Sequence, residues 1–193
     1  LHSTKAMALN CNKCYFTFGR FQPPTTGHAE NFAGVKREAG SHDYRIYISQ
    51  TVDKKGSNPL PPDRKLHYMN KMFPEHRGKI FSGPKQPVAI LQDLMLAGYD
   101  EVCFLVGSDR VGAMQFLHKY NGKDFSFRKI EIKSSGSRDA DGDTFAISGT
   151  KMRRAAFAGD FTTFRSGIPR ALNDNDCRAL MKEIQANLPA NFK

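Results

Sequence analysis

Short apolar segments alternate with amphipathic ones along most of this chain, and this alternation constrains the fold more than any other feature. The apolar segments predict five strands, at residues 15–18, 44–49, 79–81, 101–106 and 128–132. The segments between and after them predict helices at residues 27–39, 63–73, 88–97 and 110–119, from 149 onward, and at 173–187. Because strands that alternate with helices form parallel sheets, we expect an α/β fold. It is a Rossmann-like, doubly wound parallel sheet of five strands, with helices on both faces and a C-terminal helix.

The chain of 193 residues is long enough for one domain with a sizeable core. We expect this domain to span residues 15–193, with a helical C-terminal segment from about residue 160, after an irregular N-terminal extension over residues 1–14. Cys11 and Cys14 form a Cys-x-x-Cys pair in that extension. No second pair of ligands is present to complete a tetrahedral zinc site, so free thiols are favoured over a zinc or redox site. Cys103 lies in an apolar strand segment and is expected in the core.

The chain carries 29 Lys and Arg residues against 19 Asp and Glu residues, a formal net charge of +10 at pH 7. This excess favours polyanionic partners such as nucleotides, nucleic acid or acidic surfaces, without selecting among them. The sequence has no apolar run long enough to span a bilayer and no signal-peptide pattern near residue 1. We therefore expect no membrane partner and a cytoplasmic location, and the oligomeric state stays open.

A turn rich in glycine and proline follows the first predicted strand, in the segment Gly19-Arg20-Phe21-Gln22-Pro23-Pro24-Thr25-Thr26-Gly27-His28. Gly19 allows a sharp turn, and Gly27 allows the start of the next helix to approach a ligand closely. The N–H groups and dipole of a helix N-terminus favour phosphate. His28 in the first turn can donate to a phosphate oxygen and stabilise charge on a departing pyrophosphate. The alternative is a histidine that only caps the helix.

A second helix start carries small hydroxyl residues and basic side chains, in the segment Ile147-Ser148-Gly149-Thr150-Lys151-Met152-Arg153-Arg154. Ser148 and Thr150 are suited to N-cap and first-turn positions, and Gly149 permits close approach. Lys151 and Arg154 either add positive field or face solvent. Two helix N-termini of this kind can converge on one polyphosphate, which points to nucleotidyl transfer.

Both segments resemble the nucleotidyltransferase superfamily, which includes nicotinamide-nucleotide adenylyltransferases, phosphopantetheine adenylyltransferase and glycerol- or choline-phosphate cytidylyltransferases. Thr25-Thr26-Gly27-His28 is similar to its first signature, (H/T)xGH, and the segment from Ser148 to Arg153 is similar to its second, SGTxxR. Gly19-Arg20-Phe21-Gln22-Pro23 looks most like the archaeal-type nicotinamide mononucleotide adenylyltransferases, and the flanking segments look like the family's bacteriophage members. Thr25 stands where that archaeal-type branch commonly has histidine, as it does in the phosphopantetheine branch.

Two shorter segments also resemble the archaeal-type branch. Asn58-Pro59-Leu60, with Arg64 and Lys65 in the next helix, is similar to its NPF-containing segment. Val106-Gly107-Ser108-Asp109-Arg110 is similar to its GS segment, which borders the base and ribose. The alternatives are an ordinary proline loop and an ordinary strand–helix turn.

The resemblance implies catalytic roles for His28, Arg153 and Thr25, with Arg153 clamping the β- and γ-phosphates. It implies nucleotide contacts from Gly19, Arg20, Phe21, Gly27, His28, Gly107, Ser108, Asp109, Ser148, Gly149, Thr150 and Arg153. Asn58, Lys65 and Arg138 are candidates for acceptor binding, and no residue is predicted as a metal ligand. Asp139, Asp141 and Asp143 resemble the start of a calcium loop, but Thr150 at the twelfth position favours a solvated loop instead.

The implied reaction is transfer of a nucleotidyl group from an NTP, ATP above all, to a phosphate-bearing acceptor such as nicotinamide mononucleotide, with release of pyrophosphate. Magnesium is the implied cofactor, held mostly by phosphate and water. One alternative is the same chemistry with CTP or with another acceptor, such as phosphopantetheine, a sugar phosphate or a lipid-head alcohol phosphate. Another is a non-catalytic protein that keeps the fold and binds nucleic acid or virion components, located in the host cytoplasm or the virion if the chain is encoded by a bacteriophage.

Overall fold

The structure, a computed structural model, describes residues 12–136 and 147–193. Its centre is a five-stranded sheet with the order β3-β2-β1-β4-β5, in which every pair of neighbours is parallel. The strands are β1 (Lys13–Gly19), β2 (Asp43–Ile48), β3 (Ile80–Ser82), β4 (Glu101–Val106) and β5 (Lys129–Ser134). The predicted α/β class and the five-stranded parallel sheet are confirmed.

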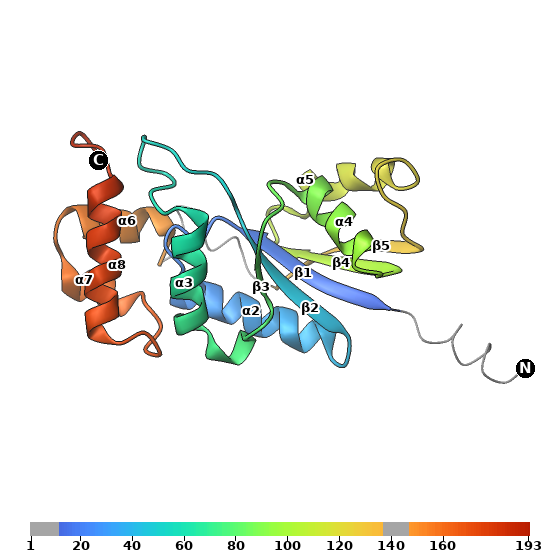
Figure 1. Ribbon diagram of the computed structural model, residues 1–193, viewed down its shortest axis with the longest axis horizontal. Helices are drawn as coiled ribbons and strands as arrows, with labels where there is room; N and C mark the ends of the chain where they lie inside the picture. Colours follow the sequence, from blue (N-terminus) through green and yellow to red (C-terminus); the bar gives the residue numbers. More distant parts are fainter. Residues whose placement is uncertain (1–11, 137–146) are drawn as a thin grey trace, which may run out of the picture.

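Helices connect the strands and continue beyond the last one (Figure 1). Those between strands are α2 (Thr26–Ala39), α3 (Pro62–Met72), the 3₁₀ helix η1 (Pro74–His76), α4 (Pro87–Leu96), α5 (Val111–Met114) and the 3₁₀ helix η2 (Gln115–Tyr120). After β5 come α6 (Gly149–Phe157), α7 (Phe161–Ser166) and α8 (Asp174–Asn187), which gather beside α3 at the end of the molecule opposite β5 (Figure 1). In the described ranges, none of these helices has the length and apolar character needed to cross a membrane.

Side chains from both faces of the sheet are buried under helices. On one face Ile46 and Leu105 belong to an apolar cluster with residues of α2, α3 and the C-terminal helices. On the other face Phe16 and Phe104 pack with residues of α4 and η2, with 4.4 Å between their ring centroids. Figure 1 shows α2 and α4 on opposite sides of the strands. This burial on both faces explains why the strands are apolar along most of their length.

The strand order places a change of direction at the middle of the sheet. The chain runs outward through β1, β2 and β3, then returns to add β4 on the other side of β1. Crevices at the carboxyl ends of strands on either side of such a switch point are the usual ligand sites of open α/β sheets. The residues that follow β1 and β4 are therefore the first place to look for function.

Three local expectations were wrong. β1 begins at Lys13, so Cys14 pairs with Asp43 and Val102 and is fully buried, rather than lying in an irregular extension. Residues 110–119 form no single α-helix: α5 has four residues and η2 follows it. Only Leu117 is buried there, so the segment lacks the apolar face that stabilises a longer helix. Asp63 does not cap α3, which begins at Pro62.

Candidate functional site

A contact between Gly19 and Phe21 shapes the turn after β1. Phe21 has a φ of 49°, and its ring folds back over the preceding glycine. A Cβ atom on Gly19 would lie 2.7 Å from the Cζ atom of Phe21, so only glycine fits without displacing the ring. The buried ring also packs edge-to-face on His28, with 4.8 Å between centroids. Gly19 and Phe21 thus build the turn against which His28 is positioned.

Gln22 joins this turn to the loop after β2. Its buried side chain donates from Nε2 to the carbonyl oxygen of Leu60, and the N–H of Leu60 donates back to Oε1, both at 2.9 Å. The Asn58-Pro59-Leu60 segment is therefore docked against the first motif. Asn58 is buried and donates from Nδ2 to Asp53 at 2.7 Å. Its Oδ1 atom accepts no hydrogen bond from the described residues.

The orientation of His28 is set by the backbone at the start of α2. Thr25 is the N-cap residue, and its N–H donates to Nδ1 of His28 at 3.0 Å. Because Nδ1 accepts this bond, the neutral imidazole carries its proton on Nε2. The side chain is only 2% exposed and lines a pocket described below. His28 is thus held as a hydrogen-bond donor from Nε2, which is the form suited to a phosphate oxygen.

The second motif meets the first through Arg153. Ser148 caps α6 as predicted, since its hydroxyl accepts a backbone N–H in the first turn at 3.2 Å. Arg153 is 5% exposed and donates to the carbonyl oxygen of Gln22 at 2.7 Å and to Oγ1 of Thr150 at 3.2 Å. A Cβ atom on Gly149 would lie 2.9 Å from Nη1 of Arg153. Glycine therefore makes room for the hydrogen bond that joins α6 to the turn after β1.

Lys65 links the chain segments that follow β1 and β2. Its side chain is 0% exposed, and Nζ donates to the carbonyl oxygens of Arg20 and Ser49 at 2.8 Å and to Oγ of Ser49 at 2.9 Å. These oxygens replace the water that a buried ammonium loses. Lys65 thereby holds the turns after β1 and β2, and its predicted role in acceptor binding stays a prediction.

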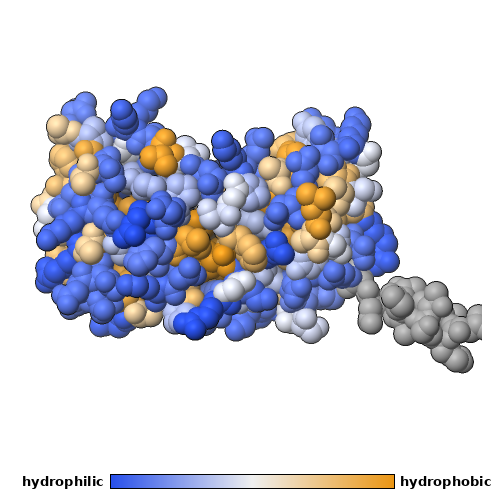
Figure 2. Space-filling view, in the orientation of Figure 1, coloured by the Kyte–Doolittle hydropathy of each residue, from blue (hydrophilic) through white to orange (hydrophobic). Residues whose placement is uncertain are grey.

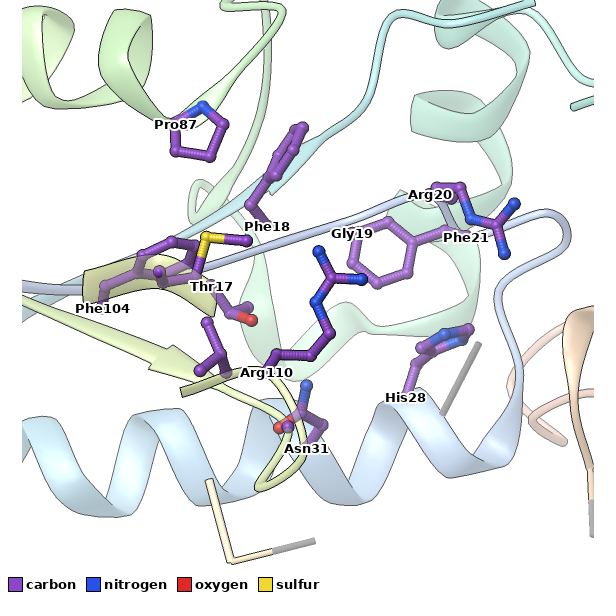
Figure 3. Close-up of a pocket in the computed structure, with 13 residues that line it drawn as sticks. Thr17, Phe18, Gly19, Arg20, Phe21, His28, Asn31, Pro87, Phe104 and Arg110 are labelled. Carbon is purple, nitrogen blue, oxygen red and sulfur yellow. The ribbon is translucent and has the colours of Figure 1, made fainter. Parts of the chain in front are cut away.

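A pocket of about 240 Å³ opens at the carboxyl ends of β1 and β4 (Figure 3). It is lined by Thr17, Phe18, Gly19, Arg20, Phe21, His28, Asn31, Pro87, Phe104, Val106, Gly107, Arg110 and Met114. The lining combines aromatic and aliphatic groups with two guanidinium groups, an imidazole, an amide and a hydroxyl. None of these described lining residues is acidic. Figure 2 shows that the surface in the same orientation as Figure 1 is mostly hydrophilic, with an apolar area near the centre of the molecule.

The structure brings together part of the predicted set. The predicted site residues that line the pocket are Gly19, Arg20, Phe21, His28 and Gly107. Ser108 and Asp109 are exposed and lie outside its lining, although they follow Gly107 directly. Thr25, Gly27 and the second-motif residues lie outside the lining as well. Arg138 and the acidic residues after it lie outside the described residues, as does Cys11.

Three polar residues of the pocket had no predicted role. Asn31 lies three residues after His28 on α2, so helical spacing places both on one face and could have identified it. Arg110 stands at the end of the GS-like segment and directly before α5. Thr17 lies in β1, where nothing in the strand pattern separates it from core positions.

The polar groups at this site suit anions better than metal ions. Across residues 12–136 and 147–193, no group of three His, Cys, Asp or Glu side chains is placed to hold a metal. Guanidinium, imidazole N–H, hydroxyl and backbone N–H groups are donors to phosphate oxygens. The thiols described here are buried, and burial raises the pKa of Cys14 to about 12 and that of Cys103 to about 11. Both thiols therefore stay protonated near neutral pH and are poor ligands and nucleophiles.

No protein-family model matches this chain, and a search of curated proteins finds no significant match. Function must therefore be inferred from the residues and geometry of the site.

Proposed function

We propose that the protein is a nucleotidyltransferase that transfers an adenylyl group from ATP to a phosphate-bearing acceptor and releases pyrophosphate. The observation that carries this proposal is the 2.7 Å hydrogen bond from Arg153 to Gln22, which joins α6 to the turn that precedes α2. Two helix N-termini, a histidine held as a donor and a buried guanidinium are groups that together suit a polyphosphate. The absence of acidic residues from the described pocket lining supports an anionic ligand further.

In the proposed reaction, an oxygen of the acceptor's phosphate attacks the α-phosphorus of ATP in line. A new P–O bond forms while the bond from the α-phosphorus to the α–β bridging oxygen breaks, and pyrophosphate leaves with that electron pair. The acceptor's phosphate is already ionised near neutral pH, so the reaction needs no general base. Positioning and stabilisation of charge then supply the rate enhancement.

We assign the side chains the following roles, which their placement supports. Nε2–H of His28 would donate to phosphate oxygens on which charge grows as pyrophosphate leaves. Arg153 and Thr150, joined at 3.2 Å, would bind the β- and γ-phosphates together. Gly27 and Gly149 would let the backbone N–H groups of the two helix starts approach the same triphosphate.

Magnesium in this proposal arrives with the nucleotide. The donors around the pocket do not fit a protein-held divalent ion, which takes carboxylate and carbonyl oxygens. The triphosphate itself and water would supply its ligands, and the ion would offset negative charge on the phosphates. None of the roles proposed above for the side chains requires a metal ligand from the chain.

Nicotinamide mononucleotide is the acceptor that we favour, which would place the protein in NAD biosynthesis in the cytoplasm. The resemblance of the Gly19-to-Pro23 segment to the archaeal-type branch is the main support. The pocket adds a second line of support, because Phe18, Phe104 and Met114 offer apolar surface that suits a planar ring. Other phosphorylated acceptors and CTP are the competing substrates within the same reaction type.

The test is a screen of pyrophosphate release with magnesium, each of the four NTPs and several acceptors. The acceptors are nicotinamide mononucleotide, phosphopantetheine, a sugar phosphate and choline phosphate. We expect the highest rate with ATP and nicotinamide mononucleotide. If no combination releases pyrophosphate, the proposal fails. Binding of random oligonucleotides that weakens with salt and persists in a His28→Ala/Arg153→Ala double variant would instead favour the non-catalytic alternative.

His28→Ala tests the assignment of the catalytic donor. We expect kcat to fall by at least about 10²-fold with a small change in the KM for ATP, because the donor acts mainly in the transition state. His118→Ala is the matched control, since that histidine is exposed and lies outside the pocket lining. Turnover like that of the wild type in His28→Ala would contradict the assignment.

A further inference from the structure

The connection between α7 and α8, residues 167–173, reaches the start of α2. The carbonyl oxygen of Gly167 accepts the backbone N–H of Thr26 at 3.0 Å. Thr26 is the first residue of α2, so its N–H has no acceptor within that helix. The C-terminal helices lie at the end of the molecule where α2 begins (Figure 1). A residue distant in the sequence thus caps the helix start that carries His28.

Gly167 is also in close contact with α6. Its φ of −93° is accessible to residues with a side chain, so the backbone conformation does not require glycine. A Cβ atom at this position would lie 2.5 Å from Sδ of Met152 and 2.8 Å from Cγ2 of Ile147. Met152 belongs to α6, and Ile147 directly precedes the N-cap residue of that helix. Gly167 therefore contacts the elements that carry both motifs, and it can do so because it has no side chain.

Arg165 holds the α7–α8 connection in its conformation. Its guanidinium donates to the carbonyl oxygen of Leu172 at 2.9 Å and to Oδ1 of Asp174 at 2.8 Å. Leu172 is fully buried in the apolar cluster that includes residues of α2 and α6. A planar guanidinium that makes several hydrogen bonds at once fixes the geometry of its partners. Arg165 thereby joins the end of α7 to the start of α8 and holds the residues between them.

The first turn of α2 supplies two donors to the proposed reaction. The N–H of Thr26 donates to Gly167, and the N–H of His28 donates to the carbonyl oxygen of Thr25 at 3.1 Å. Between them, the N–H of Gly27 donates to no acceptor among the described residues. The proposed function directs this N–H and Nε2–H of His28 to one triphosphate. The hydrogen bond to Gly167 therefore fixes the turn from which both donors project.

We propose that the α7–α8 connection aligns the first motif with the second, with Gly167 and Arg165 as positioning residues. Gly167 holds the start of α2 through its carbonyl oxygen and approaches α6 closely because it lacks a side chain. Arg165 keeps that carbonyl oxygen in place. This link is separate from the hydrogen bond between Arg153 and Gln22. The inference rests on the proposed function, because the alignment of two helix starts matters for a triphosphate that contacts both.

The test combines amide hydrogen exchange by NMR with turnover, for the wild type and for Arg165→Ala. We expect the N–H of Thr26, and the N–H of Thr25 that holds His28, to exchange at least about 10-fold faster, because local opening becomes easier. Amides of β4 should change by a smaller, uniform factor that reports the overall loss of stability. At a temperature where the variant is folded by circular dichroism, kcat should fall by about 10- to 100-fold, as displacement of positioned groups implies.

Three further variants separate positioning from a general loss of stability. Arg170→Ala is the matched control, since it removes an exposed arginine from the same connection and should change neither exchange nor kcat. Arg165→Lys keeps the charge and part of the hydrogen bonding, so it should recover part of kcat. Gly167→Ala adds a Cβ against Met152 and should show the same selective exchange at Thr26 and the same fall in kcat.

The proposal is overturned if Arg165→Ala and Gly167→Ala exchange the Thr26 amide as the wild type does. It is also overturned if kcat falls only in proportion to the fraction of unfolded molecules.

The outcomes also distinguish the connection from the reaction. If the wild type releases pyrophosphate and Arg165→Ala exchanges Thr26 faster but keeps its kcat, the positioning role is wrong and the reaction stands. If the wild type releases no pyrophosphate, the proposed reaction fails, and binding of inorganic triphosphate by calorimetry decides the rest. Binding about 10-fold weaker in Arg165→Ala would support the alignment of the two helix starts. Equal binding, or none in the wild type, would overturn it.

Discussion

Replacement of Gly149 by alanine should weaken the contact that joins the two motifs. The added Cβ would lie 2.9 Å from Nη1 of Arg153 and 3.1 Å from the carbonyl oxygen of Gln22, the two atoms that form the 2.7 Å hydrogen bond. The carbonyl belongs to the backbone, and the side chain of Gln22 is held on both sides by Leu60. The guanidinium is therefore the group that must move.

The expected change in the free energy of unfolding combines two opposing effects. Loss of a buried hydrogen bond from a charged donor lowers the free energy of unfolding by about 1.5–3 kcal/mol. Alanine instead of glycine in a helix contributes about 0.5–1 kcal/mol in the other direction. The net loss is about 0.5–2.5 kcal/mol, which for a chain of this size lowers Tm by roughly 1–10 °C.

Thermal and urea denaturation followed by circular dichroism would measure this change. Gly112→Ala in α5 is the matched control, because its added Cβ meets nothing within 4 Å and its φ is not positive. That variant should be as stable as the wild type or slightly more stable. If Gly149→Ala also melts at or above the wild-type temperature, the hydrogen bond between Arg153 and Gln22 does not stabilise the fold and the reasoning is refuted.

Three further predictions concern the same free energy of unfolding. A hydrogen bond from Lys13, with help from two more lysines and against the effect of burial, lowers the pKa of Glu131 to about 2 from an ordinary value of 4.5. The stabilisation from Glu131 is therefore present above about pH 4.5 and is lost as the pH falls toward 2. In urea denaturation the wild type should lose its advantage over Glu131→Gln across that range, and a constant difference would contradict this. Burial lowers the pKa of His76 below 6.5, so the unfolded chain takes up the proton first and stability falls as the pH drops below about 6.5. An NMR titration that places the pKa of His76 above 6.5 would refute this reasoning. Gln22→Ala leaves both backbone groups of Leu60 without their present partner and should lower stability by about 2–4 kcal/mol, whereas a loss below about 1 kcal/mol would show that water or another group replaces it.

The fold could be predicted because strands of a buried parallel sheet are apolar in the sequence itself. The prediction for residues 101–106 coincides with β4, Glu101–Val106, whose side chains are buried on both faces. The predictions of local structure were wrong where contacts with residues distant in the sequence determine that structure. Cys14 follows a lysine and an asparagine, so only pairing with β2 and β4 shows that it belongs to the core. The segment after Arg110 has helix-forming residues, but it buries too little to form one long helix.

The candidate site was predictable where local backbone geometry dictates residue type. Gly19 and Gly149 must be glycine because a Cβ would meet Phe21 or Arg153, and such positions are visible as motifs. Asn31 belongs to no motif, and Arg110 only ends the GS-like segment. Both reach the pocket through the arrangement of α2 and β4. The burial of Lys65 is likewise invisible in the sequence, because a lysine is expected at the surface unless oxygens such as those of Ser49 surround it.

One polar side chain of each motif, His28 in the first and Arg153 in the second, is held in place by a backbone group. The Thr25 N–H fixes the imidazole of His28, and the carbonyl of Gln22 fixes Arg153. Groups held in this way need little reorganisation when charge develops on a ligand. Substitutions at Gln22 should therefore reduce stability and turnover together, because they disturb the backbone that carries the donors.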